Sequence, residues 1–489
     1  MRLAEGERRW GWRRSALAAA LALVAGAATA TAADAAPSPD DASRTAPRFH
    51  TELEAAYPAA DTVHTHEIEE VRLRYTTAVQ PSLSTITVRG SGGVLAGVAD
   101  PETVPGSGGR EIRAALERPL PSGSYTVEWR TAGPDGHPIR GSYGFRVDRP
   151  ATSDTLDTVP APAPAPVAVE ETEDGPERSA ATAPLGLSVR WLFFTAVIGM
   201  VGVPAFRLAV AGATAGGERL GGILAPAARR SRTLAWAVGG LALALVPVRL
   251  VLQATALFGA DAWRPTRLGA LLESTWGAGW ALHLGLASLF LLGVAWPGAG
   301  GARARGWWVA ASAGMGMPLA VALSGHAAAA GPTVLAVLND GVHVAAAGLW
   351  AGTLACVLLV GIPALREGVE SEEDGILPGL DVLVAAFSRL AVVAVGMLVL
   401  SGLVSAWLQV GGIGALFGTS YGRTLLLKLA LVVPAVALGF YNWRVVRPAI
   451  KGRPRVGLFR LPASVEVLLA LAVLMVTAVL VALPRPGGP

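Results

Sequence analysis

The segment GPTVLAVLNDGVHVAAAGLWAGTLACVLLVGIP, residues 331–363, decides the class of fold. It contains one charged side chain, Asp340, and one imidazole, His343. Because a bilayer span needs about 20 predominantly apolar residues, this segment predicts a transmembrane helix that carries a carboxylate and an imidazole into hydrocarbon. The whole chain of 489 residues agrees, with 52% hydrophobic and 16% charged residues and a mean hydropathy of +0.48. We therefore expect an integral membrane protein.

Further stretches of the chain are long and apolar enough to cross a bilayer. The predicted spans are residues 186–211, 233–257, 270–296, 306–328, 332–362, 383–410, 424–446 and 463–484. Lys and Arg collect in the loops after the first, third and seventh spans, which makes these loops cytoplasmic and both mature ends external. The sequence pI of about 9.5 then reflects membrane topology, so we expect no nucleic-acid partner.

Residues 1–36 have the layout of a secretory signal peptide, with an Arg-rich start, an apolar core and small residues after the core. The core is shorter than a membrane span, so we expect cleavage rather than retention as an anchor. The residues that follow are then exported, and residues 37–47 form a disordered mature N-terminus. Cys356 is the single cysteine, which excludes an intrachain disulfide, so the exported part must be stabilised by its own core.

Residues 48–147 contain short alternating runs, such as STITVRG and GSYTVEWRT, separated by Pro, Gly, Ser and Asp. This period of two predicts a small all-β domain. Residues 148–184 are rich in Pro and Ala and then acidic, which is typical of an extended linker. Residues 185–489 hold the spans. The predicted fold class is therefore an exported all-β sandwich or barrel, joined by a Pro-rich linker to an all-α polytopic membrane bundle of about eight helices.

Imidazoles inside the spans are candidate functional groups, since an ionisable side chain is costly in a bilayer. His283, His326 and His343 qualify, and a short turn between the fourth and fifth spans brings His326 near His343. Asp340 lies three residues before His343 on the same helix face, where it can orient a metal-ligating ring. The alternative interpretation is that each histidine is satisfied by a carbonyl group in a packed bundle.

A second group of candidate ligands lies in WRTAGPDGHPIRGSYGFRV, residues 129–147. Here Asp135 and His137 flank a glycine between two strand-like runs. One interpretation is a hairpin turn, because tight turns favour Pro, Asp and Gly. The other is a metal site, because the carboxylate and the imidazole can bind one cation and Cu(II) prefers nitrogen and oxygen ligands. Such a site needs further ligands from elsewhere in the chain.

This segment resembles the C-terminal half of the CopC copper-binding domain, with its Gly-x-Tyr-x-Val-x-Trp strand, its Asp-Gly-His-Pro turn and its Gly-x-x-x-Phe strand. Residues 50–79 resemble the start of that domain. The membrane part resembles CopD in the segments SGHAAAAGPTVLAVLNDGVHVAAAGLWAGTL, FSRLAVVAVGMLVLSGLVSAWLQV and TSYGRTLLLKLALVVPAVALGFYNWRVVRP. The resemblance implies a small Ig-like β-sandwich or barrel that binds Cu(II) through His50, Asp135 and His137.

In the CopC family the first histidine binds copper through its amine as well as its ring. Signal cleavage near Ala30 or Ala35 leaves His50 inside the chain, where its backbone nitrogen is an amide, so a weaker or rearranged site is expected. His64 and His66 lie at strand spacing on one face and are alternative ligands. The other interpretation is that these two histidines are solvent-facing strand residues.

The resemblance also implies copper ions as the cargo, as Cu(II) in the exported domain and as Cu(I) in the membrane domain. There Met315 and Met317 offer soft sulfur ligands, unless they simply fill the core. We expect capture outside the cytoplasmic membrane and inward movement from His137 to His326 and His343, in copper homeostasis or resistance. Besides the lipid bilayer, a copper-accepting protein is an expected partner. No G-x-x-x-x-G-K-[ST] phosphate loop is present, so ATP-driven pumping is not expected. We expect binding and movement of the ion rather than enzymatic activity.

Two other functions stay open on the sequence alone. Intramembrane histidines can ligate haem, which makes a haem-binding membrane electron carrier the first alternative. The second is a copper chaperone or sensor that binds copper outside and passes it to a partner without transport.

Overall fold

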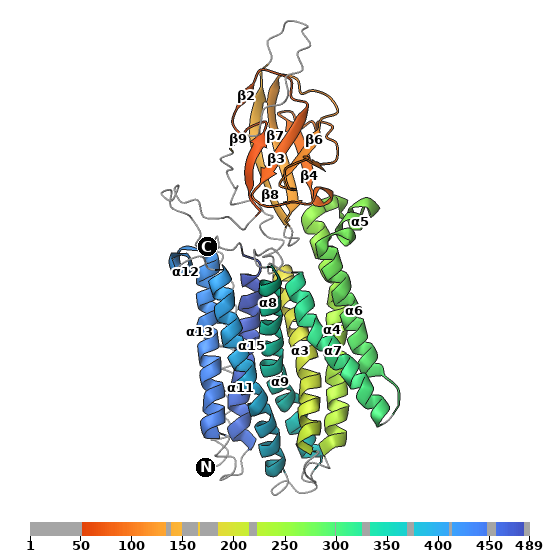
Figure 1. The fold of residues 1–489 in the computed structure, drawn as a ribbon, viewed down its shortest axis with the longest axis vertical. Coiled ribbons are helices and arrows are strands. Elements are labelled where there is room, and N and C mark those ends of the chain that lie inside the picture. The colour runs from red at the N-terminus through yellow and green to blue at the C-terminus, as the bar shows by residue number, and fades with distance from the viewer. Residues whose placement is uncertain are drawn as a thin grey trace, which may run out of the picture.

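The computed structural model describes residues 51–133, 138–148, 165–166, 184–214, 223–298, 300–324, 333–368, 376–409, 413–446 and 456–483. Within these residues a β-domain lies at one end of a bundle of long helices (Figure 1). We call this end of the bundle the β-domain end and the opposite one the far end.

The β-domain consists of two sheets, with five and four strands among the described residues. The strands are β1 (Leu53–Tyr57), β2 (Val63–His64), β3 (Glu70–Tyr75), β4 (Thr85–Gly90), β5 (Glu102–Thr103), β6 (Glu111–Ala115), β7 (Gly123–Ala132), β8 (Pro138–Val147) and β9 (Ala165–Pro166). One sheet has the order β5-β6-β3-β1-β9 and the other the order β2-β8-β7-β4. β9 comes from the predicted linker and pairs with β1.

Alternation along the strands explains the core between the sheets. In β3 the buried residues are Val71, Leu73 and Tyr75, and the charged residues between them are half-buried. The Tyr75 ring meets the ring of Trp129 from β7 edge to face, with 5.5 Å between centroids. A period of two places every second side chain on the inner face. The predicted all-β sandwich is therefore confirmed.

β7 and β8 form a long antiparallel hairpin whose register runs from Gly123 opposite Val147 to Ala132 opposite Pro138. At about 3.3 Å per residue, each strand of the hairpin is about 30 Å long. β2 pairs in parallel with the Val147 end of β8, where His64 lies opposite Val147. The hairpin therefore separates His64 from Ala132 by the length of the domain.

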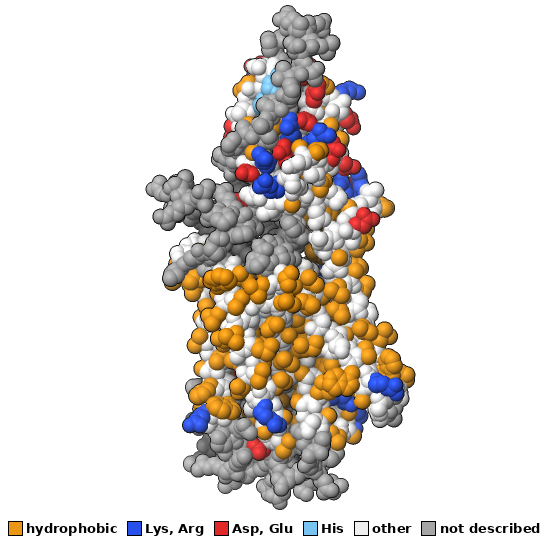
Figure 2. Space-filling model, in the orientation of Figure 1, with side chains coloured by type: hydrophobic (Ala, Val, Ile, Leu, Met, Phe, Trp, Pro, Cys, Tyr) orange, Lys and Arg blue, Asp and Glu red, His pale blue; other side chains and the backbone are white. Residues whose placement is uncertain are grey.

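Eight helices among the described residues are long and apolar enough to cross a membrane. Their elements are α3 (Pro184–Thr214), α4 (Leu224–Phe258), α6 (Thr275–Ala295), α7 (Gly301–Leu323), α8 (Thr333–Ala347) continued by α9 (Thr353–Cys356) and α10 (Ile362–Glu367), α11 (Ile376–Gln409), α13 (Ser420–Tyr441) and α15 (Val456–Leu480). The short helices α5 (Pro265–Glu273) and α12 (Ile413–Gly418) lie at the β-domain end. Hydrophobic side chains form a broad band over the bundle face in Figure 2. The predicted bundle of about eight membrane helices is confirmed.

The fifth span contains π-helical turns, Gly348–Gly352 between α8 and α9 and Val357–Gly361 between α9 and α10. A Cβ atom on Gly352 would lie 2.5 Å from the carbonyl oxygen of Ile198 in α3, and one on Gly202 would lie 2.4 Å from the Gly352 backbone. The two backbones therefore touch without side chains between them, a close approach that small residues permit in membrane bundles.

An apolar cluster joins the β-domain to the bundle, and we call it the docking cluster. Its members are Leu83 and Ala132 of the β-domain and Ala254, Leu257, Phe258, Ala262, Leu271 and Trp276 of the helices. Polar contacts border it. Gln80 Nε2 donates to Thr275 Oγ1 at 3.3 Å, and Arg267 pairs with Asp100 at 3.2 Å. The Ala132 end of the β7–β8 hairpin is thereby held directly on the helices.

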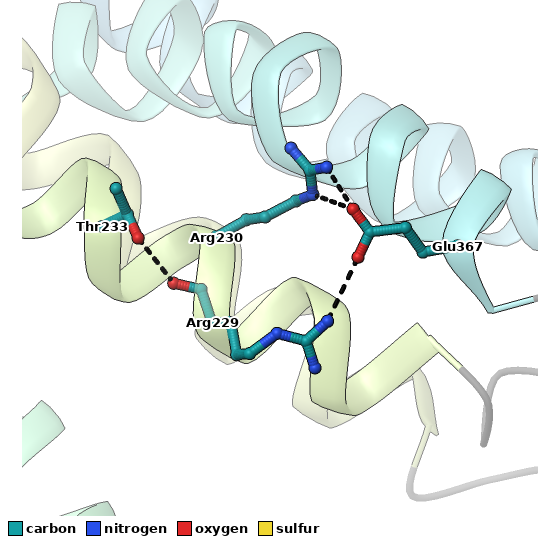
Figure 3. A network of polar contacts seen from close by, with 4 residues as sticks. All are labelled: Arg229, Arg230, Thr233 and Glu367. Atoms are coloured by element: carbon teal, nitrogen blue, oxygen red, sulfur yellow. Dashed lines mark hydrogen bonds and ion pairs between the residues drawn. The ribbon is translucent and has the colours of Figure 1, made fainter.

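Charged side chains meet at the far end, where Glu367 of α10 accepts hydrogen bonds from two arginines of α4 (Figure 3). Arg229 Nη2 donates to one carboxylate oxygen at 3.2 Å, and Arg230 Nε donates to the other at 2.8 Å. Thr233 Oγ1 donates to the carbonyl oxygen of Arg229 at 3.3 Å. Because these groups are exposed, the ion pairs position the helix ends more than they stabilise the fold.

Replacing Gly352 with alanine is expected to destabilise the bundle, because the added methyl group has no room against α3. Overpacking of this kind costs about 1–3 kcal/mol, so the midpoint of thermal unfolding in detergent should fall by several degrees. Gly240→Ala in α4 is the matched control, because nothing lies within 4 Å of a Cβ atom there. Equal midpoints for the two variants would contradict the close contact.

Candidate metal path

Four candidate ligands lie outside the described residues, and these are His50, Asp135, His137 and His326. The described residues that flank the Asp-Gly-His segment show where its hairpin ends. Ala132 pairs with Pro138 and belongs to the docking cluster. The strands that carry this segment therefore end at the bundle.

The chain next to His50 reaches the same end of the β-domain. Thr51 Oγ1 lies 2.6 Å from Thr77 Oγ1. A few residues further along, the backbone N–H of Gln80 donates to the carbonyl oxygen of Ala132 at 3.4 Å. The described neighbours of the three ligands that the family resemblance implies thus converge at the end of the β-domain that faces the helices.

Of the imidazoles on the candidate path, His343 is the one that the structure describes. It lies about 15 Å along α8 from Thr333. Its Nδ1 lies 2.9 Å from Ser401 Oγ on α11. The Ser401 hydroxyl donates its proton to the carbonyl oxygen of Met397 at 2.6 Å. His343 Nδ1 is therefore the donor in the bond to Ser401. This tautomer leaves a lone pair on Nε2, the electron pair that a metal ion needs.

The acceptor for His343 Nδ1 is Ser401, whereas the sequence analysis gave the orienting role to Asp340. Asp340 interacts electrostatically with Lys428 of α13, and Lys428 also acts on His343. A carboxylate, an ammonium group and an imidazole from two helices thus share one region of the bundle.

The polar partners of α8 on α11 were not expected from the sequence. Asn339 Nδ2 donates to the carbonyl oxygen of Ser401 at 3.0 Å and to Ser405 Oγ at 2.9 Å. Asn339 and His343 are four residues apart, as are Ser401 and Ser405, so each pair lies on one helix face. This spacing in the sequence could have indicated that each pair shares a helix face. We call Asn339, Asp340, His343, Ser401, Ser405 and Lys428 the polar seam.

The two candidate methionines lie in different environments. Met317 is fully buried in the main apolar cluster of the bundle, whereas Met315 is 46% exposed on its surface. Residues two apart on a helix point about 200° apart, so the structure does not bring these thioethers together. Within the described ranges, no three His, Cys, Asp or Glu side chains are grouped closely enough to hold a metal ion.

The third intramembrane imidazole, His283, has cationic surroundings. Its ring lies edge-on to Phe193 with 5.2 Å between centroids, and its Nδ1 is 3.5 Å from Arg249 Nη1. The Arg249 guanidinium lies 4.2 Å from the Phe193 centroid, and Arg190 acts electrostatically on Arg249. We call these four residues the cationic cluster. Among the described residues, His283 and His343 have different partners, so these two intramembrane imidazoles share no contact that would mark a common site.

His64 and His66 lie at the end of the β-domain away from the helices, where β2 joins β8. Their ring centroids are 5.4 Å apart. His64 Nε2 is 2.8 Å from Thr62 Oγ1, and His66 Nε2 is 3.0 Å from Tyr57 Oη. The hairpin, about 30 Å long, separates both rings from Ala132. The structure therefore does not bring them to the end where the Asp-Gly-His strands terminate.

The fold and its polar groups define a class of protein, a multi-pass membrane protein with a β-sandwich docked on its helices and ionisable groups inside the bundle. Family models identify the parts. Residues 53–148 match the CopC domain, residues 181–335 match Copper resistance protein D-like, N-terminal domain, and residues 382–480 match Copper resistance protein D. The chain belongs to the CopC/CopD copper transport and resistance family, as a fusion of a CopC domain with CopD modules.

Similar proteins carry names that concern copper. Copper transport protein CutJ of Bacillus subtilis (strain 168) is 27% identical over 381 residues, which cover 76% of this chain and 63% of CutJ, less than two thirds of that relative. Copper resistance protein C of Escherichia coli is 31% identical over 103 residues, which cover 20% of this chain and 81% of the relative. The crystal structure of CopC from Methylosinus trichosporium OB3b is 30% identical, with 22% of this chain and 100% of that chain covered and a TM-score of 0.19.

Titration of His64 is expected to report its environment. Burial lowers the pKa of His64 below its ordinary value of 6.5, and the neighbouring His66 lowers it further. The unfolded chain then binds this proton at a higher pH than the folded chain, so protonation opposes folding as the pH falls below about 6.5. NMR titration of isotope-labelled histidine in the full-length protein should give His64 a midpoint below 6.5. His66→Gln should raise that midpoint, and a parent midpoint above the ordinary value would contradict the burial.

Proposed function

We propose that this protein captures copper ions on the outer side of the cytoplasmic membrane and moves them inward through the bundle, in copper homeostasis or resistance. The β-domain is the capture module, with His50, Asp135 and His137 as candidate Cu(II) ligands. The polar seam around His343 is the station inside the membrane. The role is binding and transfer without chemical conversion of a substrate, and a copper-accepting protein is the expected recipient. The names of the relatives, copper transport and copper resistance, support this assignment.

The observation that carries the proposal is the docking of the β7–β8 hairpin on the bundle. Ala132 packs in the docking cluster with Leu257 and Trp276. His137 directly precedes Pro138 in the chain, and Pro138 pairs with Ala132, so the strand that follows this ligand begins at the end of the hairpin that is docked on the helices. A copper ion released from the capture module therefore has a short route into the membrane domain.

The distribution of charge favours a route along α8 and α11. The cationic cluster of α3, α4 and α6 holds two arginines, and repulsion between like charges is strong where the dielectric constant is low. The polar seam holds one ammonium group, Lys428, whose charge Asp340 counters, and it offers an imidazole and hydroxyl oxygens to a cation. We therefore place the copper path in the half of the bundle that contains His343.

We assign the β-domain to the outer side because of the charge at the far end. Arg229 and Arg230 lie in the first turns of α4, at the end of this helix away from α5 and the β-domain (Figure 1), and Figure 2 shows further basic side chains at that end. Cytoplasmic loops collect Lys and Arg. The predicted signal peptide leads to the same orientation, since it would export the residues that follow it.

Cu(II) binding by the full-length protein should depend on His137. His137→Ala removes an imidazole ligand, so Cu(II) affinity at the β-domain should fall by more than about tenfold, the scale seen for loss of groups that only orient a ligand. Competition titration followed by electron paramagnetic resonance measures this change. His64→Ala is the control, since His64 lies at the opposite end of the hairpin. An unchanged Cu(II) spectrum and affinity in His137→Ala would remove His137 from the site.

Uptake of isotope-labelled copper into proteoliposomes should be lost in His343→Ala. Ser401→Ala keeps the imidazole but removes the acceptor of its Nδ1–H, so copper binding at this station should weaken by about 10–100-fold. Ser388→Ala is the matched control, because Ser388 is also buried on α11 and its hydroxyl donates to the carbonyl oxygen of Val384 in its own helix.

Equal uptake by the parent protein and His343→Ala would remove the polar seam from the path. Copper bound by the parent protein without any flux would overturn transport and favour the chaperone or sensor function.

A further inference from the structure

A buried carboxyl group lies in the same half of the bundle as the polar seam, and the proposed function does not use it. Glu466 of α15 is 2% exposed and lies about 15 Å along its helix from Val456. Among the described residues its hydrogen-bond partners are neutral side chains. An ionised carboxylate without a cation is unfavourable inside a membrane protein, so this group calls for a physical explanation.

Two donors from π-helical turns bind this carboxyl group. Trp350 Nε1 donates to Glu466 Oε1 at 2.8 Å, and Asn442 Nδ2 donates to Oε2 at 2.9 Å. Trp350 stands in the π-helical segment Gly348–Gly352, and Asn442 begins the segment Asn442–Val446 that follows α13. π-Helical turns are rare and occur frequently at functional sites. Two such turns that converge on one carboxyl group indicate a site that is built for it.

A glycine lets the backbone of α13 approach the same group. A Cβ atom on Gly439 would lie 3.1 Å from Glu466 Oε1, which is closer than ordinary van der Waals contact. Gly439 and Asn442 are three residues apart, so they lie on one face of the helix toward α15. The carboxyl group is therefore enclosed between helix backbones.

Asn442 can form a hydrogen bond with this carboxyl group in both of its protonation states. Its Oδ1 is buried and, within the described part of the chain, has no hydrogen-bond partner. When Glu466 is ionised, Asn442 Nδ2 donates to it, as the structure shows. When Glu466 is protonated, its hydroxyl becomes a donor, and a rotation of the amide by about 180° presents Oδ1 as the acceptor. A lysine or arginine in this place would satisfy the ionised state alone.

No charged side chain among the described residues forms an ion pair with Glu466. The ionisable groups on the elements packed against it, and on its own helix, are Tyr421, Arg423, Lys428 and Tyr441 of α13, Arg444 of the π-helical segment, Arg190 and Arg207 of α3, Cys356 of α9 and Arg460 of α15. Arg444 and Arg460 are exposed. Arg190 donates to the carbonyl oxygen of Ala478, much further along α15. The charge state of Glu466 thus depends on its neutral partners and on any ion that enters the polar seam.

We propose that Glu466 is a proton-binding site that releases a proton when a copper ion enters the polar seam and regains one when the ion leaves. This inference rests on the proposed function for the identity of the ion. The exchange offsets charge, because one carboxylic acid becomes a carboxylate and releases one proton as the copper cation arrives. His343 and Trp350 are seven residues apart, about 10 Å along the helix, and charges interact strongly over that distance in a low dielectric. Copper movement is thereby coupled to proton exchange.

Infrared difference spectroscopy of the full-length protein tests the proton site without copper. The parent protein should show the C=O stretch of a neutral carboxyl group that vanishes as the pH is raised. Glu466→Gln, which keeps an oxygen for Trp350, should lack this band. Asn442→Leu removes a donor to the carboxylate, so the band should persist to higher pH. Glu273→Gln, an exposed carboxyl group at the β-domain end, is the control. If Glu466→Gln shows the same pH-dependent carboxyl band as the parent protein, the proposal is overturned.

Proteoliposomes that contain a pH-sensitive dye test the coupling. A copper gradient should drive proton movement in the parent protein, and Glu466→Gln should lose most of this movement while copper still binds at the polar seam. Copper flux in the parent protein without proton movement would overturn the coupling and leave the transport function standing. If the infrared band of Glu466 titrates but the parent protein moves no copper, the transport function is overturned and only the proton site is supported.

Discussion

A polar side chain that lies in hydrocarbon has to find its partners inside the protein, because lipid offers none. This constraint explains the polar contacts within the bundle. Ser401 accepts the hydrogen bond that fixes the ring of His343. Trp350 and Asn442 hold the carboxyl group of Glu466. Each partner comes from a different helix than the group it serves, so the packing of the helices and the chemistry of the bundle are determined together. A change in helix register would leave an ionisable group without its partner.

The same constraint gives the two halves of the bundle different electrostatic character. In the half formed by α3, α4 and α6, Arg249 lies over the ring of Phe193, with a second arginine near it. In the half formed by α8, α11, α13 and α15, Asp340 interacts electrostatically with Lys428, and Glu466 is held by neutral donors. The positive charge of the first half opposes entry of a cation, whereas in the second half Asp340 counters the charge of Lys428. The π-helical turns also lie in this second half. Such turns occur frequently at functional sites. Here two of them carry the side chains of Trp350 and Asn442, which bind the Glu466 carboxyl group.

Hydropathy along the chain was sufficient to predict the eight spans, because a bilayer imposes similar length and composition on every span. Period-two alternation was likewise sufficient for the β-sandwich. The partners inside the candidate site were not predictable to the same degree. Ser401 lies 58 residues from His343 in the sequence, and Glu466 lies 116 residues from Trp350. Spacing within one helix shows which side chains share a face, but it does not show which other helix that face meets. For the same reason the position of His64 needed the structure, since only the parallel pairing of β2 with β8 places it a domain length from the helices.

The docking of the β-domain has a consequence for how tightly the proposed capture site needs to bind. A transport site has to bind its ion well enough to load and weakly enough to unload. A capture module tethered by a linker alone would need high affinity, since a released ion would escape into solution. The docking cluster instead holds Ala132 against α4 and α6, so the proposed transfer is intramolecular, with a high effective concentration of the acceptor. Moderate affinity is then an advantage. If His50 binds through its ring without a free amine, as the predicted cleavage implies, the weaker site suits a module that passes its ion to His343 rather than one that stores it.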